Sequence, residues 1–137
     1  MPAISRFEEI EAWKTARQLT NLIYKISSQG EFARDFGLKD QIRRAAVSVM
    51  SNIAEGFESQ TQAQFIRYLS IAKASSAEVR SQLYIALDQN YITKEQFDHA
   101  FDIADKALRQ LAGFIAYLKS HPRPRGVREE DANYSTE

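Results

Sequence analysis

At 137 residues, with 44% hydrophobic and 26% charged residues, the chain has the size and composition of one soluble globular domain. Its 18 basic and 18 acidic residues give a formal net charge of zero, so global charge gives no support for non-specific binding to nucleic acid or to an anionic membrane. The absence of cysteine excludes a disulfide framework, thiol catalysis and a Cys-ligated zinc site.

Nothing in the sequence resembles a targeting or membrane segment. The N-terminal sequence has no basic region followed by an apolar run, so no signal peptide is expected. No stretch approaches the roughly 20 consecutive apolar residues that a membrane span needs. We therefore expect a cytoplasmic protein with no membrane partner.

The first predicted helix runs from about Phe7 to Ser28. Apolar residues recur along it at the spacing of one helix face, which is typical of an amphipathic helix packed on a core. That face consists of Ala12, Ala16, Leu19, Ile23 and Ile26. The turn QGEFARDFG then separates this helix from the next.

The second predicted helix begins near Asp35–Leu38 and ends around Gly56, where we expect the glycine to form a left-handed C-cap. Apolar and small residues fill about 200° of its circumference, whereas a surface helix usually needs only about 100°. These residues are Ala45, Val49, Gly56, Ile42, Ile53, Ala46, Met50, Phe57, Ala54 and Val47. We expect this helix to be buried twice, once in its own bundle and once against another surface.

Capping boxes open the third and fourth predicted helices, at Thr61 with Gln64 and at Thr93 with Gln96. The dipeptide Gln89-Asn90 separates these two helices. Their apolar stripes repeat in strict 4-3 spacing: Phe65, Leu69, Ala72, Ser76, Val79, Leu83 and Ala86, then Phe97, Phe101, Ala104, Leu108, Leu111, Ile115 and Leu118. This period, with short connections, predicts an all-α fold: an antiparallel up-down-up-down four-helix bundle with left-handed packing.

The composition changes from Ser120 onward. Pro122 and Pro124 prevent the helix from continuing, and apolar residues become rare. We therefore predict a four-helix-bundle domain at residues 1–119 and a polar C-terminal tail at residues 120–137.

The surplus of apolar surface predicts a homo-oligomer, because an isolated bundle would leave a large apolar patch in water. Besides the second helix, the fourth carries apolar residues beside its core stripe. The expected interface residues are Val47, Met50, Ala54, Phe57, Ile103, Phe114 and Tyr117. The alternative is a monomer whose long loop and tail cover this surface.

No pattern of catalytic or metal-binding residues is present. The two histidines, His99 and His121, do not form the Glu-x-x-His pairs of di-iron bundles, and Glu95 with His99 is a common helical surface pair. Gly-rich phosphate loops, G-x-S-x-G motifs and paired inward carboxylates are missing. We expect no enzymatic activity, no metal and no cofactor.

A local basic patch could still bind nucleic acid. An up-down arrangement gathers several cations toward one end of the bundle, and basic residues beside tyrosine are suited to phosphates and bases. The candidate nucleic-acid-binding residues are Arg43, Arg44, Arg67, Lys73 and Arg80. The alternative is ordinary surface ion pairing, for example between Asp40 and Arg43 or Arg44.

Three segments, in order, resemble a known family: FEEIEAWKTARQL, FGLKDQIRRAAVSVMSNIAEGF and FIRYLSIAKASSAEVRSQLYIALDQNYI. They are similar to bacterial four-helix-bundle proteins labelled for intervening sequences of 23S ribosomal RNA genes. The resemblance covers about Phe7 to Leu118 and implies an antiparallel bundle that assembles into a ring-like homopentamer. A related member is the accessory protein of diversity-generating retroelements, whose pentameric barrel binds nucleic acid and the reverse transcriptase.

Two functions remain open at this point. The first is a non-enzymatic, homo-oligomeric binding or scaffold protein with RNA or DNA as its ligand. The second is a protein–protein interaction scaffold without affinity for nucleic acid, which the neutral net charge favours.

Overall fold

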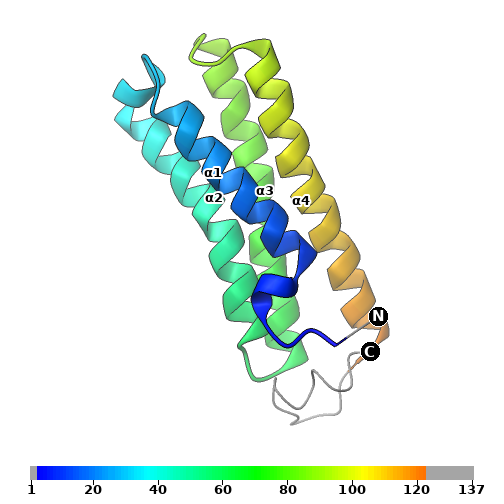
Figure 1. Cartoon of the computed structure of the whole chain (residues 1–137). Helices are drawn as coiled ribbons and strands as arrows, with labels where there is room; N and C mark the ends of the chain where they lie inside the picture. The colour runs from blue at the N-terminus through cyan, green and yellow to red at the C-terminus, as the bar shows by residue number, and fades with distance from the viewer. Residues whose placement is uncertain (1–2, 123–137) are drawn as a thin grey trace.

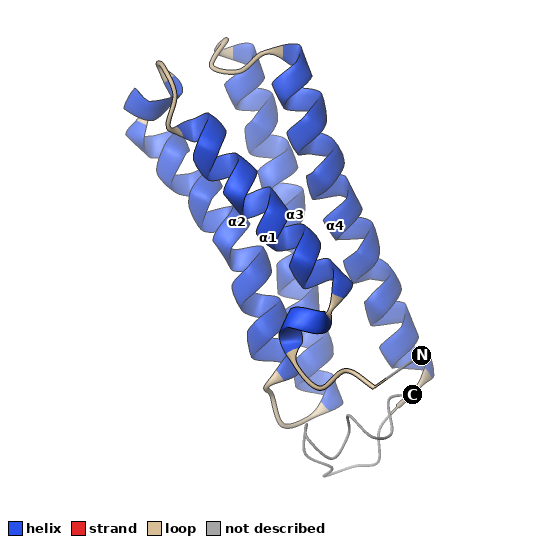
Figure 2. Cartoon of the chain, in the orientation of Figure 1, coloured by secondary structure: helices blue, strands red, loops and turns tan. Residues whose placement is uncertain are grey.

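A computed structural model describes residues 3–122 of the chain. Its elements are the short 3-10 helices η1 (Phe7–Glu9) and η2 (Phe32–Arg34) and the helices α1 (Glu11–Ser27), α2 (Phe36–Phe57), α3 (Gln62–Asp88) and α4 (Lys94–Ser120). Figure 2 shows helices joined by short loops, and no strand occurs in residues 3–122. The predicted all-α fold is confirmed. Of the predicted tail, residues 120–137, the part beyond residue 122 lies outside the described residues.

The four long helices form an up-and-down bundle. Each runs in the direction opposite to the helix before it (Figure 1). Neighbours in sequence are neighbours in space, since α1 packs on α2, α2 on α3 and α3 on α4, and α4 closes the bundle against α1. The handedness of the packing stays a prediction.

The predicted core stripes are buried in α1 and α3, but α4 faces the core differently from the prediction. All the predicted core residues of α1 and α3 are at most 3% exposed. In α4, Phe101 and Leu108 are only half-buried, whereas Ala100 and Ala107 are completely buried. The wide apolar arc of α4 allowed either stripe to face inward, and packing against α1 and α3 selected the one that includes the small residues.

Most of the apolar arc of α2 is buried within the bundle itself. Seven of its ten residues are buried, Met50 and Ala54 are half-buried, and Val47 is 39% exposed. Phe57 and Ile103, which we expected at a subunit interface, are 5% and 8% exposed. Their side chains lie in the core of the bundle and leave little surface for a second copy, and their place at an interface stays a prediction.

Gly56 has a role different from the predicted one. It lies inside α2 with helical backbone, and α2 ends at Phe57, so Gly56 is not a left-handed C-cap. A Cβ at this position would lie 2.8 Å from Tyr68 Cβ and 2.9 Å from Phe65 Cδ1. Glycine is therefore required because α2 and α3 approach each other closely here, not because the chain turns.

The helix ends follow the local sequence. Both predicted capping boxes form, at Thr61 with Gln64 and at Thr93 with Gln96. Asn90, just after α3, adopts φ of 61°, the left-handed conformation that asparagine tolerates at helix ends.

Asp35 connects two loops at one end of the bundle by hydrogen bonds: its own loop before α2 and the loop between α3 and α4. One carboxylate oxygen caps α2 by accepting from the Leu38 backbone N–H at 3.1 Å, and the other accepts from the Tyr91 hydroxyl at 2.9 Å. Tyr91 also stacks on Phe32, with ring centroids 5.5 Å apart. The hydrogen bond to Asp35 raises the pKa of Tyr91 above its ordinary value of 10.0.

Gly56→Ala should lower the free energy of unfolding by about 1–3 kcal/mol, because the added methyl group forces α2 away from α3. Urea denaturation followed by circular dichroism measures this change. Gly113→Ala is the matched control, since a Cβ there meets no heavy atom within 4 Å. It should raise stability by about 0.5–1 kcal/mol, the usual gain of alanine over glycine inside a helix. Equal effects of the two substitutions would contradict the packing role of Gly56.

Tyr91→Phe should weaken the dependence of stability on alkaline pH. In the native protein the pKa of Tyr91 is raised, so its contribution is complete below about pH 10 and is lost as the pH rises through the higher native value. Thermal unfolding from about pH 9 to about pH 11 should therefore show a shallower loss in the variant. Tyr84→Phe, at an exposed tyrosine, is the control and should follow the wild type.

Candidate functional site

An open groove runs along the solvent side of α2 next to α1. It has a volume of about 620 Å³ and is lined by Tyr24, Asp40, Arg43, Arg44, Val47, Ser48, Ser51 and Asn52. Tyr24 comes from α1 and the other lining residues from α2. From Asp40 to Asn52 the helix rises about 18 Å, at 1.5 Å per residue. The groove is thus the strip of α2 that neither α1 nor α3 covers.

Arg43 is held in a defined position at this groove. Its Nε donates to Ser27 Oγ at 2.8 Å and its Nη2 donates to the Tyr24 carbonyl at 3.3 Å. The guanidinium carbon lies 4.4 Å from the centre of the Tyr24 ring, a cation–π contact. The sequence places Arg43 within the apolar arc of α2, and the structure resolves this conflict by turning the side chain along α1 toward the groove.

The charges of Arg43 and Arg44 are not neutralised by neighbouring acids. Within residues 3–122, no carboxylate oxygen lies within 4.0 Å of either guanidinium, and Arg44 is exposed with no hydrogen bond to the protein. Asp40 lines the same groove, but the predicted ion pairs of Asp40 with Arg43 or Arg44 do not form in this part of the chain. Two cations and one anion therefore give the groove a local positive charge.

The polar floor of the groove lies between α2 and α3. Ser48 Oγ and Ser75 Oγ are hydrogen-bonded at 2.9 Å, and Asn52 Nδ2 donates to the Ser48 carbonyl at 2.8 Å and to Ser48 Oγ at 2.9 Å. Ser51 is exposed next to them. Hydroxyl and amide groups thus continue the groove below the two arginines.

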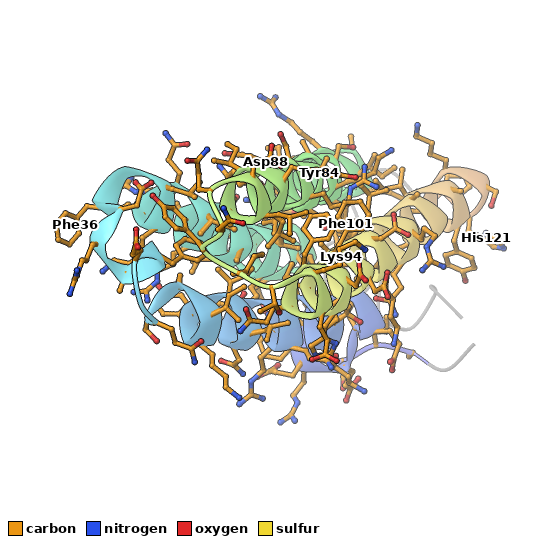
Figure 3. The ribbon with its side chains drawn as sticks, turned by 90° about the horizontal axis from the view of Figure 1, so that it is seen from above. Phe36, Tyr84, Asp88, Lys94, Phe101 and His121 are labelled. Carbon is orange, nitrogen blue, oxygen red and sulfur yellow. The ribbon has the colours of Figure 1, made fainter. Side chains whose placement is uncertain are left out.

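The other three predicted nucleic-acid-binding residues lie outside this groove. Arg80 donates to Asp105 Oδ1 at 3.0 Å and lies 5.5 Å from the centre of the Phe101 ring, on the side where α3 meets α4. Figure 3 shows Phe101 beside Tyr84 on this side of the bundle. Arg67 and Lys73 are exposed on α3. The structure therefore groups Arg43 with Arg44 and leaves the remaining three apart.

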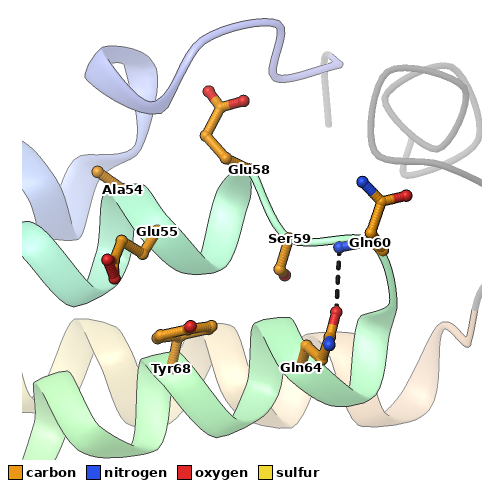
Figure 4. A pocket seen from close by; sticks show the side chains of 7 residues that line it. All are labelled: Ala54, Glu55, Glu58, Ser59, Gln60, Gln64 and Tyr68. Atoms are coloured by element: carbon orange, nitrogen blue, oxygen red, sulfur yellow. Dashed lines mark hydrogen bonds between the residues drawn. The ribbon is translucent and has the colours of Figure 1, made fainter.

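Two smaller pockets have different chemistry. The first has a volume of about 440 Å³ at the α2–α3 turn, where Glu55 of α2 lies across from Tyr68 of α3 and the Gln60 backbone N–H donates to Gln64 Oε1 at 3.1 Å (Figure 4). Its other carboxylate is Glu58. The acidic lining makes this pocket unsuited to phosphates.

The second small pocket, of about 360 Å³, lies between the N-terminal segment and α4. Its walls are mainly apolar, with Ile4, Ile10 and Phe114 among the lining residues. No histidine lines either small pocket.

Neither histidine lies in a cluster of potential metal ligands. His99 is exposed on α4, and His121 stacks on Tyr117 with ring centroids 4.1 Å apart. Across residues 3–122, no group of three or more His, Asp or Glu side chains is placed to hold a metal ion. In the same part of the chain, no helix has the length and apolar content to cross a membrane.

Sequence reasoning missed Tyr24, Ser48, Ser51 and Asn52 as site residues. Tyr24 follows Ile23 of the apolar face in the sequence, but the residue is 43% exposed. One signal for this site was available, because an arginine inside an apolar arc needs a partner or a cleft. The identity of that partner required the register between α1 and α2.

Comparisons with known proteins agree with this fold. A solved structure of a protein with unknown function from the S23 ribosomal protein family, from Bacteroides thetaiotaomicron, is similar with a TM-score of 0.71 and 25% sequence identity, over 76% of this chain and 97% of that chain. None of the curated proteins matches the chain. The family model described as 23S rRNA-intervening sequence protein matches residues 8–113, which confirms the resemblance noted in the sequence. The chain therefore belongs to the 23S rRNA-intervening sequence protein family.

Proposed function

We propose that this chain is a non-catalytic, homo-oligomeric binding protein of the cytoplasm, and that its ligand is RNA or DNA held in the groove between α1 and α2. The observation that carries the proposal is the pair Arg43 and Arg44, which line one groove without a carboxylate within ion-pair distance in residues 3–122. Arg43 is half-buried, and buried or half-buried charges usually have a partner in the protein. Its partners on Ser27 and Tyr24 carry no negative charge, so an anionic ligand supplies that charge, with the exposed Arg44 beside it.

The geometry of the arginines is suited to phosphate. A guanidinium carries five N–H donors, and Arg43 uses two of its nitrogens on Ser27 and Tyr24, so donors remain for a ligand. Those two bonds also hold the side chain in place before binding, which lowers the entropy lost when a phosphate is bound. Arg44 is exposed beside it and adds a second cation.

The proposal of a non-catalytic role is based on the chemistry of the groove. Its half-buried hydroxyl, that of Ser48, is hydrogen-bonded to Ser75 and Asn52, and no histidine or lysine lines the groove to activate it. Binding without chemistry is therefore the simplest use of this surface.

Self-association is the second part of the proposal. Of the expected interface residues, Met50, Ala54, Phe114 and Tyr117 are half-buried, so these four keep surface that a second copy could cover. Val47 is exposed but lines the groove proposed for the ligand. The family resemblance implies a ring of five subunits. In such a ring the groove is repeated, and a modest local charge is multiplied around the assembly.

The competing function is a protein–protein interaction scaffold without affinity for nucleic acid. Exposed apolar side chains favour it, notably Phe36 at 67%, Tyr84 at 51% and Ile85 at 46% exposure. Their exposure is typical of surfaces that contact other proteins. Direct binding measurements separate the two functions.

The double variant Arg43→Gln/Arg44→Gln should weaken binding to a fluorescein-labelled RNA or DNA oligonucleotide by about tenfold or more, because each arginine loses a charge-assisted hydrogen bond. The slope of log affinity against log salt should fall by about two, one for each lost phosphate contact. Fluorescence anisotropy over about 25–200 mM salt measures both quantities.

A matched control is Lys94→Gln/Arg109→Gln, which removes two positive charges from α4, the helix diagonal to α2. This control should bind as the wild type does. Equal weakening in both double variants would mean that affinity depends on the net charge of the protein and not on the groove. No detectable binding by the wild type at low salt would overturn the nucleic-acid function and leave the protein scaffold.

Light scattering should give a particle mass that is a multiple of the 15.7 kDa chain mass, five times that value for a pentamer. Met50→Glu should reduce the mass toward that of one chain while leaving the helical content unchanged, because a charge at a half-buried position opposes contact with a second copy. Ala63→Glu, exposed near the start of α3, is the control and should keep the wild-type mass. A monomeric wild type would contradict the assembly.

A further inference from the structure

We infer that the groove selects single-stranded nucleic acid by stacking one base on the open face of Tyr24. This inference rests on the proposed function, since it concerns the same groove, and it adds the form of the ligand and the residue that recognises it.

Tyr24 lines the groove and is partly open to solvent. The residue is 43% exposed, and the guanidinium carbon of Arg43 lies 4.4 Å from the centre of its ring. The backbone at Tyr24 is tied to the same arginine, because Arg43 Nη2 donates to the Tyr24 carbonyl at 3.3 Å. Within residues 3–122 the ring stacks on no other aromatic side chain. A flat ring fixed by a cation and left open to the groove is a stacking platform.

The base of a single strand is the ligand that uses this face together with Arg44. In a duplex each base is covered above and below by its neighbours, so its face is not available to a protein ring. In a single strand an unstacked base can lie on tyrosine while the adjoining phosphate reaches arginine. Arg43 contributes to both, since it holds the ring and keeps N–H donors for phosphate.

The size of the groove also favours a short single strand. Its volume of about 620 Å³ lies within the range of pockets that hold one small ligand, so it accommodates one base with its sugar. The rise of about 18 Å along α2 lets the strand continue along the helix beyond that base.

The order of groups along α2 sets the direction in which the strand leaves Tyr24. Asp40 lies one turn before Arg44 and repels phosphate, so the backbone is favoured on the other side, past Ser48 toward Ser51 and Asn52. There the exposed Ser51 hydroxyl donates to or accepts from base edges or sugar, and the Asn52 amide oxygen accepts from them.

The experiment uses the full chain and anisotropy at low salt with three probes of one length, about 12 nucleotides, which is within the site sizes of single-strand binders. The probes are a single strand, the same strand with abasic sites, and the corresponding duplex. The wild type should bind the single strand about tenfold more tightly than the abasic strand, and more tightly than the duplex.

Tyr24→Leu should bind the single strand about tenfold more weakly and should no longer distinguish it from the abasic strand, because leucine offers no ring face. Tyr24→Phe keeps the ring and should behave as the wild type. Tyr84→Leu, at an exposed tyrosine on α3, controls for the loss of any surface ring and should leave binding unchanged. Circular dichroism checks that all variants keep their helical content.

The two levels of the proposal fail in different ways. If no probe binds at low salt, the proposed function itself is wrong. If the abasic strand and the duplex bind as tightly as the single strand, and Tyr24→Leu binds as the wild type does, nucleic acid is bound through phosphates alone and the stacking inference is overturned.

Discussion

Helix α2 is packed on two sides, against α1 and against α3, and the other features of the protein depend on this double contact. Small residues allow it. At Gly56, α3 approaches so closely that an added Cβ would lie 2.8 Å from Tyr68 Cβ. Ala46 faces α1, where its carbonyl accepts from Thr20 Oγ1 at 3.2 Å. Because both neighbours cover α2, most of its unusually wide apolar arc is used by the bundle itself. What remains uncovered is one narrow strip.

That uncovered strip is the candidate site, and Arg43 marks its border. Arg43 is half-buried between the core and solvent, and its guanidinium contacts Ser27 and Tyr24 of α1 at the edge of the groove. Ser27 and Tyr24 supply hydrogen bonds but no negative charge. The bundle thus fixes the position of the arginine without neutralising its charge. For this reason we expect an anionic ligand to bind at the groove.

A chain with zero net charge can still contain such a site, because electrostatic interactions in salt solution are short-ranged. Three cations of α3 and α4 are paired with acids: Arg80 and Arg109 with Asp105, and Lys94 with Asp98. These pairs are partly or fully open to solvent and contribute little to stability, but they reduce the field over the α3–α4 side. The groove on α2 lacks this compensation, so local binding there is compatible with a net charge of zero.

Local patterns in the sequence determined the helices, their caps and the all-α bundle, because a capping box such as Thr61 with Gln64 needs only residues within one turn. The rotation of α4, the reason for Gly56 and the pairing of Tyr24 with Arg43 were decided by the tertiary structure. Each depends on contact between residues far apart in the chain: α4 could bury either apolar stripe, Gly56 is explained by Phe65 and Tyr68 on α3, and the groove exists only where α1 lies beside α2. Helical periodicity specifies which residues share a face, but the neighbouring helix decides which part of that face is left to solvent.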